Sequence, residues 1–497
     1  MLKKLVARIA GAIHTPLMQT TAGKQWSIYQ RAIFADVAEG KGHVLVRARA
    51  GTGKTTTIVE ALKHVPVGAS ALLVAFNKAI ATELEGRAPQ GVAVKTLHAF
   101  GFAALRNAFR TSMDANKVER IARSLFGQVP GAVLGNLGKL VSRAKSTLAA
   151  DESDLDRLID DLDLDVPEDE RSDFIDRAAE ILGACYRDTR TCDFDDMIWL
   201  AVRHGVRVPT FDMVFVDETQ DLNAAQIELA LMAVKRGGRV VAVGDDRQAI
   251  YGFRGADERA VDNIVARLGA RVLPLSITYR CGKAIVALAQ AIVPDYEAAP
   301  TAPEGIVRQA TDATMRAEAA PGDFVISRKN APLISTCLGF LAAGKPATIA
   351  GRDIGAGLLA LVNKSKAATV PALLEWIDAW EKAECVRLAA RKRDTQPATD
   401  KADCIEALTD GATSVAEVRA RIEALFSDKD DSHRIVCTTT HKAKGLERNR
   451  CWILADTFST ATTEEDNLWY VAITRAKSEL CLLGQRRTRR SDRAMAS

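Results

Sequence analysis

Short runs of apolar residues alternate with stretches of helical periodicity along the first half of the chain. The runs that predict strands lie at positions 44–46, 71–76, 92–95, 213–216 and 240–243. A helix is expected after the second run, from Lys78 to about Gly86. Near-continuous apolar strands between helices are typical of a parallel sheet that is buried on both faces. The pattern therefore predicts an α/β fold.

Two longer stretches break this alternation. No strand pattern is visible from about 105 to 186, which predicts a helical insertion. A second α/β region is expected to start near Val272, and helical periodicity returns from about 358 to 429. Within that stretch, the segment from Asp394 to Asp403 is expected to be a loop because it contains Pro397. Apolar runs of the second region lie at 324–326 and 434–437. We expect two α/β cores, each interrupted by a helical insertion.

A loop rich in small residues joins the first apolar run to a helical pattern that begins near Ile58. It consists of Ala48, Arg49, Ala50, Gly51, Thr52, Gly53, Lys54, Thr55 and Thr56. Such a strand–loop–helix segment can cradle phosphates with its backbone N–H groups at a helix N-terminus. Lys54 would reach the β- and γ-phosphates, and the Thr55 hydroxyl would bind Mg²⁺. The alternative is an ordinary turn between a strand and a helix.

Acidic residues follow the run at 213–216 directly. Asp217 and Glu218 suit a nucleotide site, because the first can hold Mg²⁺ and the second can orient or deprotonate the attacking water. The alternative is a helix N-terminus with acids on its dipole. The presence of the Lys54 loop in the same chain favours the nucleotide site.

The run at 240–243 leads into a polar, glycine-rich segment. Gln248 in this segment is expected to sense the γ-phosphate. Tyr251 and Phe253 are aromatic residues in the same segment, and such rings can stack on single-stranded bases for about 1–3 kcal/mol per base. The alternative is that both rings belong to the core.

Composition narrows the class of protein. The 497 residues suggest two to four domains, and 47% hydrophobic with 26% charged residues fits a soluble protein. No apolar run approaches the roughly 18 residues of a membrane span. Nine scattered cysteines without a C-x-x-C pair favour a reduced, cytoplasmic protein over a zinc or iron–sulfur protein. A net charge of +4 is too small to indicate nucleic-acid binding by itself.

The order of the motifs resembles that of superfamily 1 DNA helicases of the UvrD/Rep/PcrA type. The similar segments extend over nearly the whole chain, at positions 26–30, 48–55, 76–78, 96–100, 193–197, 217–221, 244–255, 278–280, 439–447 and 470–477. The resemblance implies two RecA-like P-loop domains with parallel sheets, which bind ATP and Mg²⁺ between them.

The resemblance also implies roles for individual residues. The implied catalytic residues are Lys54, Asp217, Glu218, Gln248, Arg280 and Arg475, with Arg475 as the arginine finger. The implied nucleotide contacts are Gln30 as the adenine reader, Ala50, Gly51, Thr52, Gly53, Lys54, Thr55, Thr56, Tyr279 as a ring stacked on adenine, Arg280, Glu447 and Arg475. The implied metal ligands are Thr55 and Asp217. The implied DNA contacts are Phe76, His98, Phe100, Tyr251, Phe253, Arg254, Thr440, His441 and Lys442.

The implied domains divide the chain as follows. The order is a tail at 1–22, a first RecA-like domain at 23–104 and 186–275 with a helical insertion at 105–185, a second RecA-like domain at 276–357 and 430–485 with a reduced insertion at 358–429, and a basic tail at 486–497. Two departures from the family pattern stand out. Arg49 replaces a small residue of the loop, and the second insertion is shorter than usual.

The resemblance implies an ATP-dependent DNA helicase or translocase that moves 3′→5′ on single-stranded DNA. Its expected partners are single strands, junctions of single- and double-stranded DNA, and a protein that activates unwinding; no membrane is expected. One alternative is a DNA-stimulated ATPase that strips proteins from single strands. Another is a nucleotide-switched subunit of a recombination, repair or defence complex.

Overall fold

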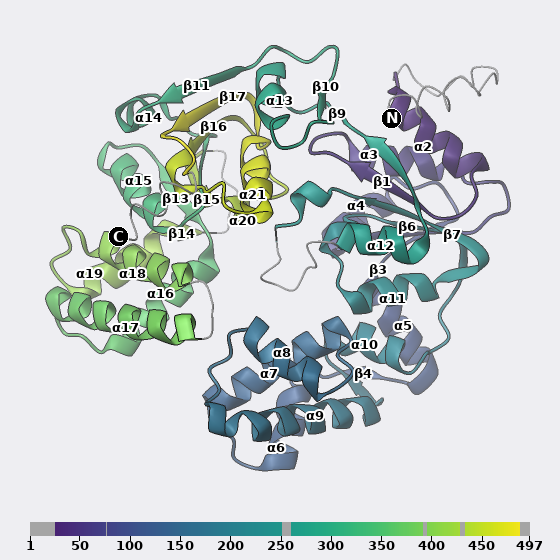
Figure 1. Cartoon of the computed structure of the whole chain (residues 1–497), viewed down its shortest axis with the longest axis horizontal. Helices are drawn as coiled ribbons and strands as arrows, with labels where there is room; N and C mark the ends of the chain where they lie inside the picture. Colours follow the sequence, from purple (N-terminus) through teal and green to yellow (C-terminus); the bar gives the residue numbers. More distant parts are fainter. Residues whose placement is uncertain (1–24, 76, 251–259, 391–394, 428–432, 488–497) are drawn as a thin grey trace. The chain divides into compact units, whose positions relative to one another are not determined.

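The computed structural model describes residues 25–75, 77–250, 260–390, 395–427 and 433–487. Its internal contacts divide the chain into two compact units, Met1–Ile277 and Thr278–Ser497, which are described separately below. Each unit is built around one large parallel sheet (Figure 1). The predicted fold class is confirmed: two RecA-like α/β cores, each carrying additional helices.

The first unit contains a six-stranded parallel sheet in the order β3-β2-β6-β7-β1-β8. Its strands are β1 (Val44–Ala48), β2 (Ala71–Ala75), β3 (Val92–Thr96), β6 (Phe211–Val216), β7 (Val234–Gly244) and β8 (Arg271–Leu275). Side chains of β1 alternate between two cores: Leu45 joins one, and Val44 and Val46 join the other. Both faces of the sheet are therefore buried, as the apolar runs predict.

The expected start of the second α/β region was wrong. Val272 lies in β8, where it pairs with Leu45 of β1, so this run completes the first sheet. The chain enters the second unit a few residues later, at Thr278.

The helices of the first unit fall into two groups. Those next to the sheet are α2 (Ile28–Glu39), α3 (Lys54–Leu62), α4 (Lys78–Glu85), α5 (Leu97–Phe109), α10 (Asp196–Arg203), α11 (Ala224–Met232) and α12 (Ala260–Leu268). The insertion contains α6 (Lys117–Phe126), α7 (Gly131–Thr147), α8 (Glu152–Asp161) and α9 (Arg171–Arg187), which form a separate helical layer in Figure 1. Two-residue strands β4 (Ser112–Met113) and β5 (Thr191–Cys192) pair where the chain enters and leaves it.

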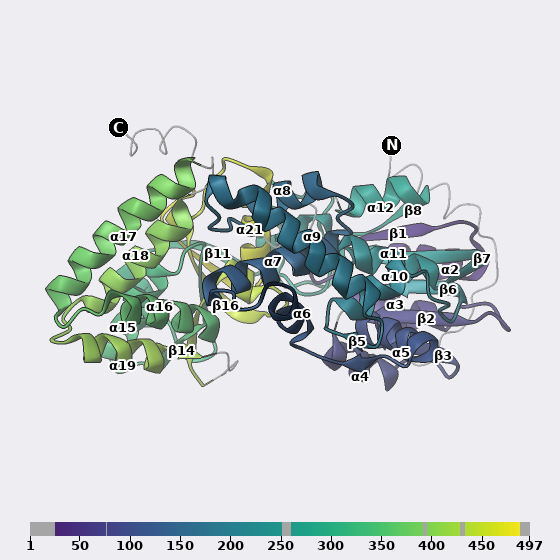
Figure 2. The same ribbon diagram turned by 90° about the horizontal axis from the view of Figure 1, so that it is seen from below.

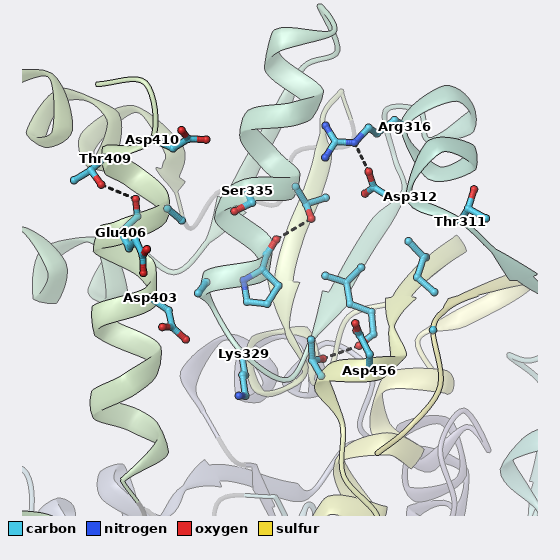
Figure 3. A pocket seen from close by; sticks show the side chains of 18 of the residues that line it. Thr311, Asp312, Arg316, Lys329, Ser335, Asp403, Glu406, Thr409, Asp410 and Asp456 are labelled. Atoms are coloured by element: carbon cyan, nitrogen blue, oxygen red, sulfur yellow. Dashed lines mark hydrogen bonds and ion pairs between the residues drawn. The ribbon is translucent and has the colours of Figure 1, made fainter. Parts of the chain in front are cut away.

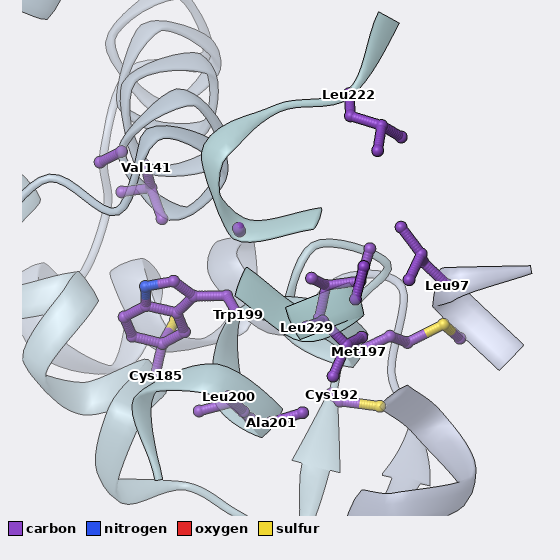
Figure 4. Packing of buried hydrophobic residues seen from close by; sticks show 14 of the residues in the cluster. Leu97, Val141, Cys185, Cys192, Met197, Trp199, Leu200, Ala201, Leu222 and Leu229 are labelled. Carbon is purple, nitrogen blue, oxygen red and sulfur yellow. The ribbon is translucent and has the colours of Figure 1, made fainter. Parts of the chain in front are cut away.

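A buried polar cluster joins the insertion to the segment before α10. Lys117 and Lys145 are fully buried. Lys145 Nζ lies 2.6 Å from Asp193 and 2.8 Å from Asp196, and Lys117 Nζ lies 2.7 Å from Asp196. Apolar side chains surround the cluster, and Trp199 lies among Val141, Cys185 and Leu200 in Figure 4. Two cations therefore neutralise two carboxylates inside the protein.

The second unit contains a seven-stranded parallel sheet in the order β11-β17-β16-β12-β15-β13-β14. Its strands are β11 (Ile306–Ala310), β12 (Phe324–Ser327), β13 (Ala347–Ala350), β14 (Phe426–Ser427), β15 (Ile435–Thr439), β16 (Arg448–Leu454) and β17 (Ala476–Leu483); a short pair is formed by β9 (Ile277–Thr278) and β10 (Glu297–Ala298). Its helices are α13 (Lys283–Ala289), α14 (Asp312–Glu318), α15 (Ala331–Ala342), α16 (Arg352–Ser365), α17 (Val370–Ala390), α18 (Gln396–Thr409), α19 (Val415–Leu425), α20 (Thr440–Ala443) and α21 (Thr463–Ile473).

The second insertion consists of α16 to α19, and α17 and α18 lie side by side in it (Figure 2). The loop expected from Asp394 to Asp403 was wrong for most of its length, because α18 begins at Gln396. Pro397 lies in the first turn of that helix. Proline is tolerated there, since the first backbone N–H groups of a helix have no partner within the helix.

Candidate nucleotide-binding site

The loop after β1 has the backbone conformation of a phosphate cradle. Gly51 and Gly53 have φ angles of 69° and 77°, in the region that favours glycine. Thr52 closes the turn, because its hydroxyl donates to the carbonyl oxygen of Arg49 at 2.8 Å. Helix α3 then begins at Lys54, so Lys54, Thr55 and Thr56 occupy its first turn.

Lys54 contacts the carboxylate predicted to activate water. Its Nζ lies 2.7 Å from Glu218 Oε2. Burial alone would lower the pKa of Lys54, but Glu218, Asp217 and Asp245 outweigh it and raise the pKa. The lysine is therefore cationic, and Glu218 is its partner. A phosphate bound at this loop would compete with Glu218 for Lys54.

Asp217 is buried at the end of β6 and lacks a full counter-charge. Burial and the neighbouring Glu218 raise its pKa to about 7, although Lys54 opposes the shift. A buried carboxylate of this kind favours a nearby cation. Mg²⁺ commonly takes one or two carboxylates and completes its shell with water and substrate phosphates. The Asp217 carboxylate and the Thr55 hydroxyl are oxygen donors of the kind that Mg²⁺ prefers.

Glu218 adopts an unusual backbone conformation. Its φ is 49°, in the left-handed region that residues other than glycine rarely occupy. Gln220 lies in the segment at 217–221, where no role was predicted for it, and it bridges two strand ends from this turn. Its Nε2 donates to Glu218 Oε2 at 2.6 Å, and its Oε1 accepts from the backbone N–H of Asp245 at 3.0 Å. A Cβ on Gly244 would lie 2.7 Å from the same Oε1, so this bridge requires glycine there.

Gln248 belongs to the same constellation. Its Nε2 donates to Asp245 Oδ2 at 2.6 Å. Since β6, β7 and β1 are neighbours in the sheet, Glu218, Gln248 and Lys54 follow three adjacent strands. The carboxyl ends of parallel strands are the usual place for ligands in α/β proteins.

Gln30 contacts the helix that follows the loop. Its Nε2 donates to Thr57 Oγ1 at 3.0 Å, and Thr57 Oγ1 donates to the carbonyl oxygen of Gly53. Gln30 also accepts from the backbone N–H of Ser27, which completes the capping box of α2. The residue expected to read adenine is thus connected to the phosphate loop.

The second unit holds a separate polar group. Arg280 Nε lies 2.5 Å from Glu447 Oε2, and Lys477 Nζ lies 2.7 Å from Glu447 Oε1. Arg475 is 1% exposed and donates to the carbonyl oxygens of Val471 and Leu446 and to the hydroxyl of Thr474. Burial, with Arg280 as a second cause, lowers the pKa of Arg475 to about 10, so it remains cationic. The Tyr279 side chain is exposed.

The residues predicted to contact DNA differ in their burial, and some lie outside the described part of the structure. Phe76, Tyr251, Phe253 and Arg254 lie outside the described residues. The structure places Phe100 in the core, 7% exposed and with its ring centroid 6.5 Å from that of Phe211, so it does not offer a face to a base. Thr440 is also buried.

Three further candidates are more accessible. His98 is half-buried at the first turn of α5, and burial lowers its pKa, which keeps the ring neutral at pH 7. His441 is half-buried. Lys442 is also half-buried, and its Nζ lies 2.6 Å from Asp353.

The second unit also contains a cavity of about 1200 Å³. It lies between α15 and α18, and Figure 3 shows Asp403, Glu406 and Asp410 along one of its walls. Burial and nearby carboxylates, Glu381 first, raise the pKa of Asp403. Arg316, Lys329 and Arg487 also line the cavity, but carboxylates outnumber them, so the cavity is a poor site for a nucleotide or a DNA backbone. Among the described residues, no helix is long and apolar enough to cross a membrane.

Comparisons with known proteins match both units. Residues 30–266 match the UvrD/REP helicase N-terminal domain, and residues 396–486 match the UvrD-like helicase C-terminal domain. Together the two matches cover about two thirds of the chain.

Individual relatives agree with these matches. F-box DNA helicase 1 of Gallus gallus is 25% identical over 88% of this chain and 47% of its own length. ATP-dependent DNA helicase Rep of Escherichia coli is 27% identical over 51% of this chain and 41% of its own length. ATP-dependent DNA helicase PcrA of Leuconostoc citreum is 24% identical over 51% of this chain and 37% of its own length. The chain therefore spans less than half of these relatives. It belongs to the UvrD/Rep/PcrA-type helicase family.

Proposed function

We propose that this chain hydrolyses ATP and uses the energy to move along single-stranded DNA. The observation that carries the proposal is the group formed by Lys54, Glu218, Asp217 and Gln248 at the ends of three adjacent strands. A lysine for the phosphates, a carboxylate for water and a buried carboxylate for a cation are the parts that phosphoryl transfer to water requires.

The proposed chemistry begins when the nucleotide phosphates take Lys54 away from Glu218. Glu218 is then free to orient a water molecule and to accept its proton during attack on the γ-phosphorus. Gln248 contacts the γ-phosphate. Mg²⁺, held by Thr55 and Asp217, would neutralise phosphate charge. Arg280 and Arg475 would neutralise the negative charge that builds up on the equatorial oxygens of the γ-phosphate in the transition state.

We propose movement on DNA because the relatives are named as DNA helicases and because His98 and His441 are only half-buried. Rep and PcrA are named as ATP-dependent DNA helicases. Stacking and backbone contacts do not depend on sequence, so the motor should bind single strands of any sequence. We propose 3′→5′ movement and binding at junctions of single- and double-stranded DNA.

The test is ATP hydrolysis with and without a single-stranded oligonucleotide, over a series of salt concentrations. Stimulation by DNA that falls as salt rises is expected, because binding to phosphates releases counterions. Lys54→Ala should abolish hydrolysis. Hydrolysis that DNA does not stimulate would contradict the proposed motor.

A second candidate is a DNA-stimulated ATPase that strips proteins from single strands without separating duplexes. Strand displacement on duplexes with 3′ tails, 5′ tails and blunt ends distinguishes the two. A nucleotide-switched subunit that does not hydrolyse ATP is less favoured, because the chain retains Lys54, Glu218 and Gln248 in mutual contact through Asp245 and Gln220.

A further inference from the structure

Arg49 is a charged residue in a loop that otherwise consists of small residues. Its backbone belongs to the turn, because its carbonyl oxygen accepts from Thr52 and its N–H donates to Leu275 of β8. A phosphate cradle uses backbone N–H groups and needs no side chain at this position. The Arg49 side chain is nevertheless only 6% exposed. The role of this buried side chain therefore follows from the groups that it contacts.

The side chain of Arg49 reaches the end of β7. Its Nη1 lies 3.2 Å from Asp245 Oδ1 and 2.7 Å from Asp246 Oδ1. Asp245 is fully buried, and a buried carboxylate is costly unless it is paired and hydrogen-bonded. Burial raises the pKa of Asp245, and Arg49 is the strongest influence that lowers it. Lys54 is the next cation, but it is paired with Glu218.

Asp245 in turn holds Gln248, whose Nε2 donates to the second oxygen of the carboxylate, Oδ2. An ionised Asp245 accepts this bond at a fixed orientation. A neutral or displaced Asp245 would let the amide of Gln248 rotate. The backbone N–H of Asp245 is fixed separately by Gln220. Arg49 therefore acts on the side chain of Asp245, and Gln220 acts on its backbone.

We propose that Arg49 is a positioning residue, which orients Gln248 through Asp245 so that the site distinguishes a nucleotide with a γ-phosphate from one without it. The proposal rests on the proposed function, and it adds a residue to the recognition of ATP at the same site. It also gives the phosphate loop and the end of β7 a direct side-chain link.

The experiment compares Arg49→Ala with the wild-type chain in two measurements. The first is the ratio of dissociation constants for ADP and for a non-hydrolysable ATP analogue, which does not depend on turnover. The second is DNA-stimulated ATP hydrolysis. We expect Arg49→Ala to change the affinity for ADP by less than about threefold. The preference for the ATP analogue and the catalytic rate should each fall by about 10- to 100-fold, the loss that is typical when a residue that orients a ligand-contacting side chain is removed.

A double-mutant cycle separates positioning from a general structural effect. If Arg49 acts through Gln248, Arg49→Ala in a Gln248→Ala background should cause no further loss. Additive losses would overturn the proposal. Arg47→Ala is the matched control, because Arg47 lies 3.6 Å from the same Asp246 but is on the strand and partly exposed. It should leave the nucleotide preference unchanged.

The outcomes also separate this inference from the proposed function. A wild-type chain that prefers the ATP analogue, together with an unchanged preference in Arg49→Ala, would overturn only the role of Arg49. A wild-type chain that binds the analogue but shows no DNA-stimulated hydrolysis would contradict the motor and leave the positioning role standing. A wild-type chain that binds neither nucleotide would overturn both.

Discussion

Glu218 and its neighbour Asp217 show three unusual features. The backbone of Glu218 is in the left-handed region, its carboxylate holds the loop lysine, and its neighbour Asp217 has a pKa near 7. A non-glycine residue in that region costs on the order of 1–3 kcal/mol and persists where the surrounding structure holds it. Here Gln220 and Lys54 hold the side chain. The strained turn therefore aims the carboxylate at the place where phosphates enter.

Glu218→Gln should abolish turnover and preserve nucleotide binding. The amide keeps the shape but cannot accept a proton, and loss of a general base typically costs about 10²–10⁴-fold in rate. Because the amide also holds Lys54 less strongly, affinity for ATP should be equal or higher. Equilibrium binding and steady-state hydrolysis measure both effects. Turnover close to that of the wild type would remove Glu218 from the mechanism.

Arg280 and Arg475, the two arginines implied to contact the nucleotide, should respond differently to truncation. Arg280 contacts a carboxylate and a backbone carbonyl, whereas Arg475 is buried among backbone carbonyls. Arg280→Ala should lower hydrolysis and leave the melting temperature nearly unchanged. Arg475→Ala should lower hydrolysis by about 10³-fold or more, the usual scale of an arginine finger, and should also lower the melting temperature.

Hydrolysis assays and thermal unfolding, carried out on the same preparations, test the pair. If a folded Arg475→Ala variant hydrolyses ATP as fast as the wild type, Arg475 has only a structural role in the core. An Arg280→Ala variant that loses stability but keeps its activity would contradict its assignment to the nucleotide.

At the scale of elements, buried lysines join the first insertion to the segment before α10, in addition to apolar packing. Lys145 of α7 contacts Asp193 and Asp196, which precede and begin α10. Removing one partner leaves a buried charge without compensation, which typically costs about 3–5 kcal/mol. Lys145→Met should therefore lower the free energy of unfolding by about that amount.

Lys139 provides the control for this prediction because it lies on the same helix and is exposed. Lys139→Met should change the free energy of unfolding by less than about 0.5 kcal/mol. Denaturant unfolding of both variants measures the difference. Equal effects of the two substitutions would show that the buried cluster does not stabilise the attachment.

The sequence predicted those elements whose signal is local. The strands β1, β2, β3, β6 and β7 were predicted because each contains a short apolar run. The apolar run of β8 was read as the start of the second α/β region, because its partner β1 lies far away in the sequence, although the implied domain boundary at 275 kept it in the first domain. Pro397 was read as a loop signal because its place in the first turn of α18 is set by packing.

The same limit applies to the candidate site. Residues of the loop and of the acidic strand ends could be predicted, because their chemistry follows the strands directly in the sequence. The bridge made by Gln220 and the reach of Arg49 to Asp245 depend on which strands are neighbours. The paired burial of Lys117 and Lys145 was not predicted either, since lysine in a sequence usually indicates an exposed surface.

For the molecule as a whole, the two insertions differ in how they are built. Within the described residues, four α-helices form each insertion, and both pack through apolar side chains. The first insertion adds the buried cluster of Lys117, Lys145, Asp193 and Asp196, whereas the second packs through residues such as Leu373, Ile377 and Leu408. The second insertion extends only from α16 to α19. If this insertion grips the DNA duplex ahead of the proposed motor, its small size leaves little surface for that contact.

A small second insertion should limit unwinding more than movement. Fewer contacts to the duplex oppose re-annealing less and allow earlier dissociation, so a monomer should translocate on single strands but separate long duplexes poorly. Single-turnover unwinding with excess unlabelled DNA trap, on 3′-tailed duplexes of increasing length, measures this. The fraction opened should fall steeply with length, and a partner protein or several copies should restore it. A 5′-tailed series is the control for polarity, and a preference for it would reverse the proposed direction. Efficient opening of the longest duplexes by single monomers would contradict the weak grip.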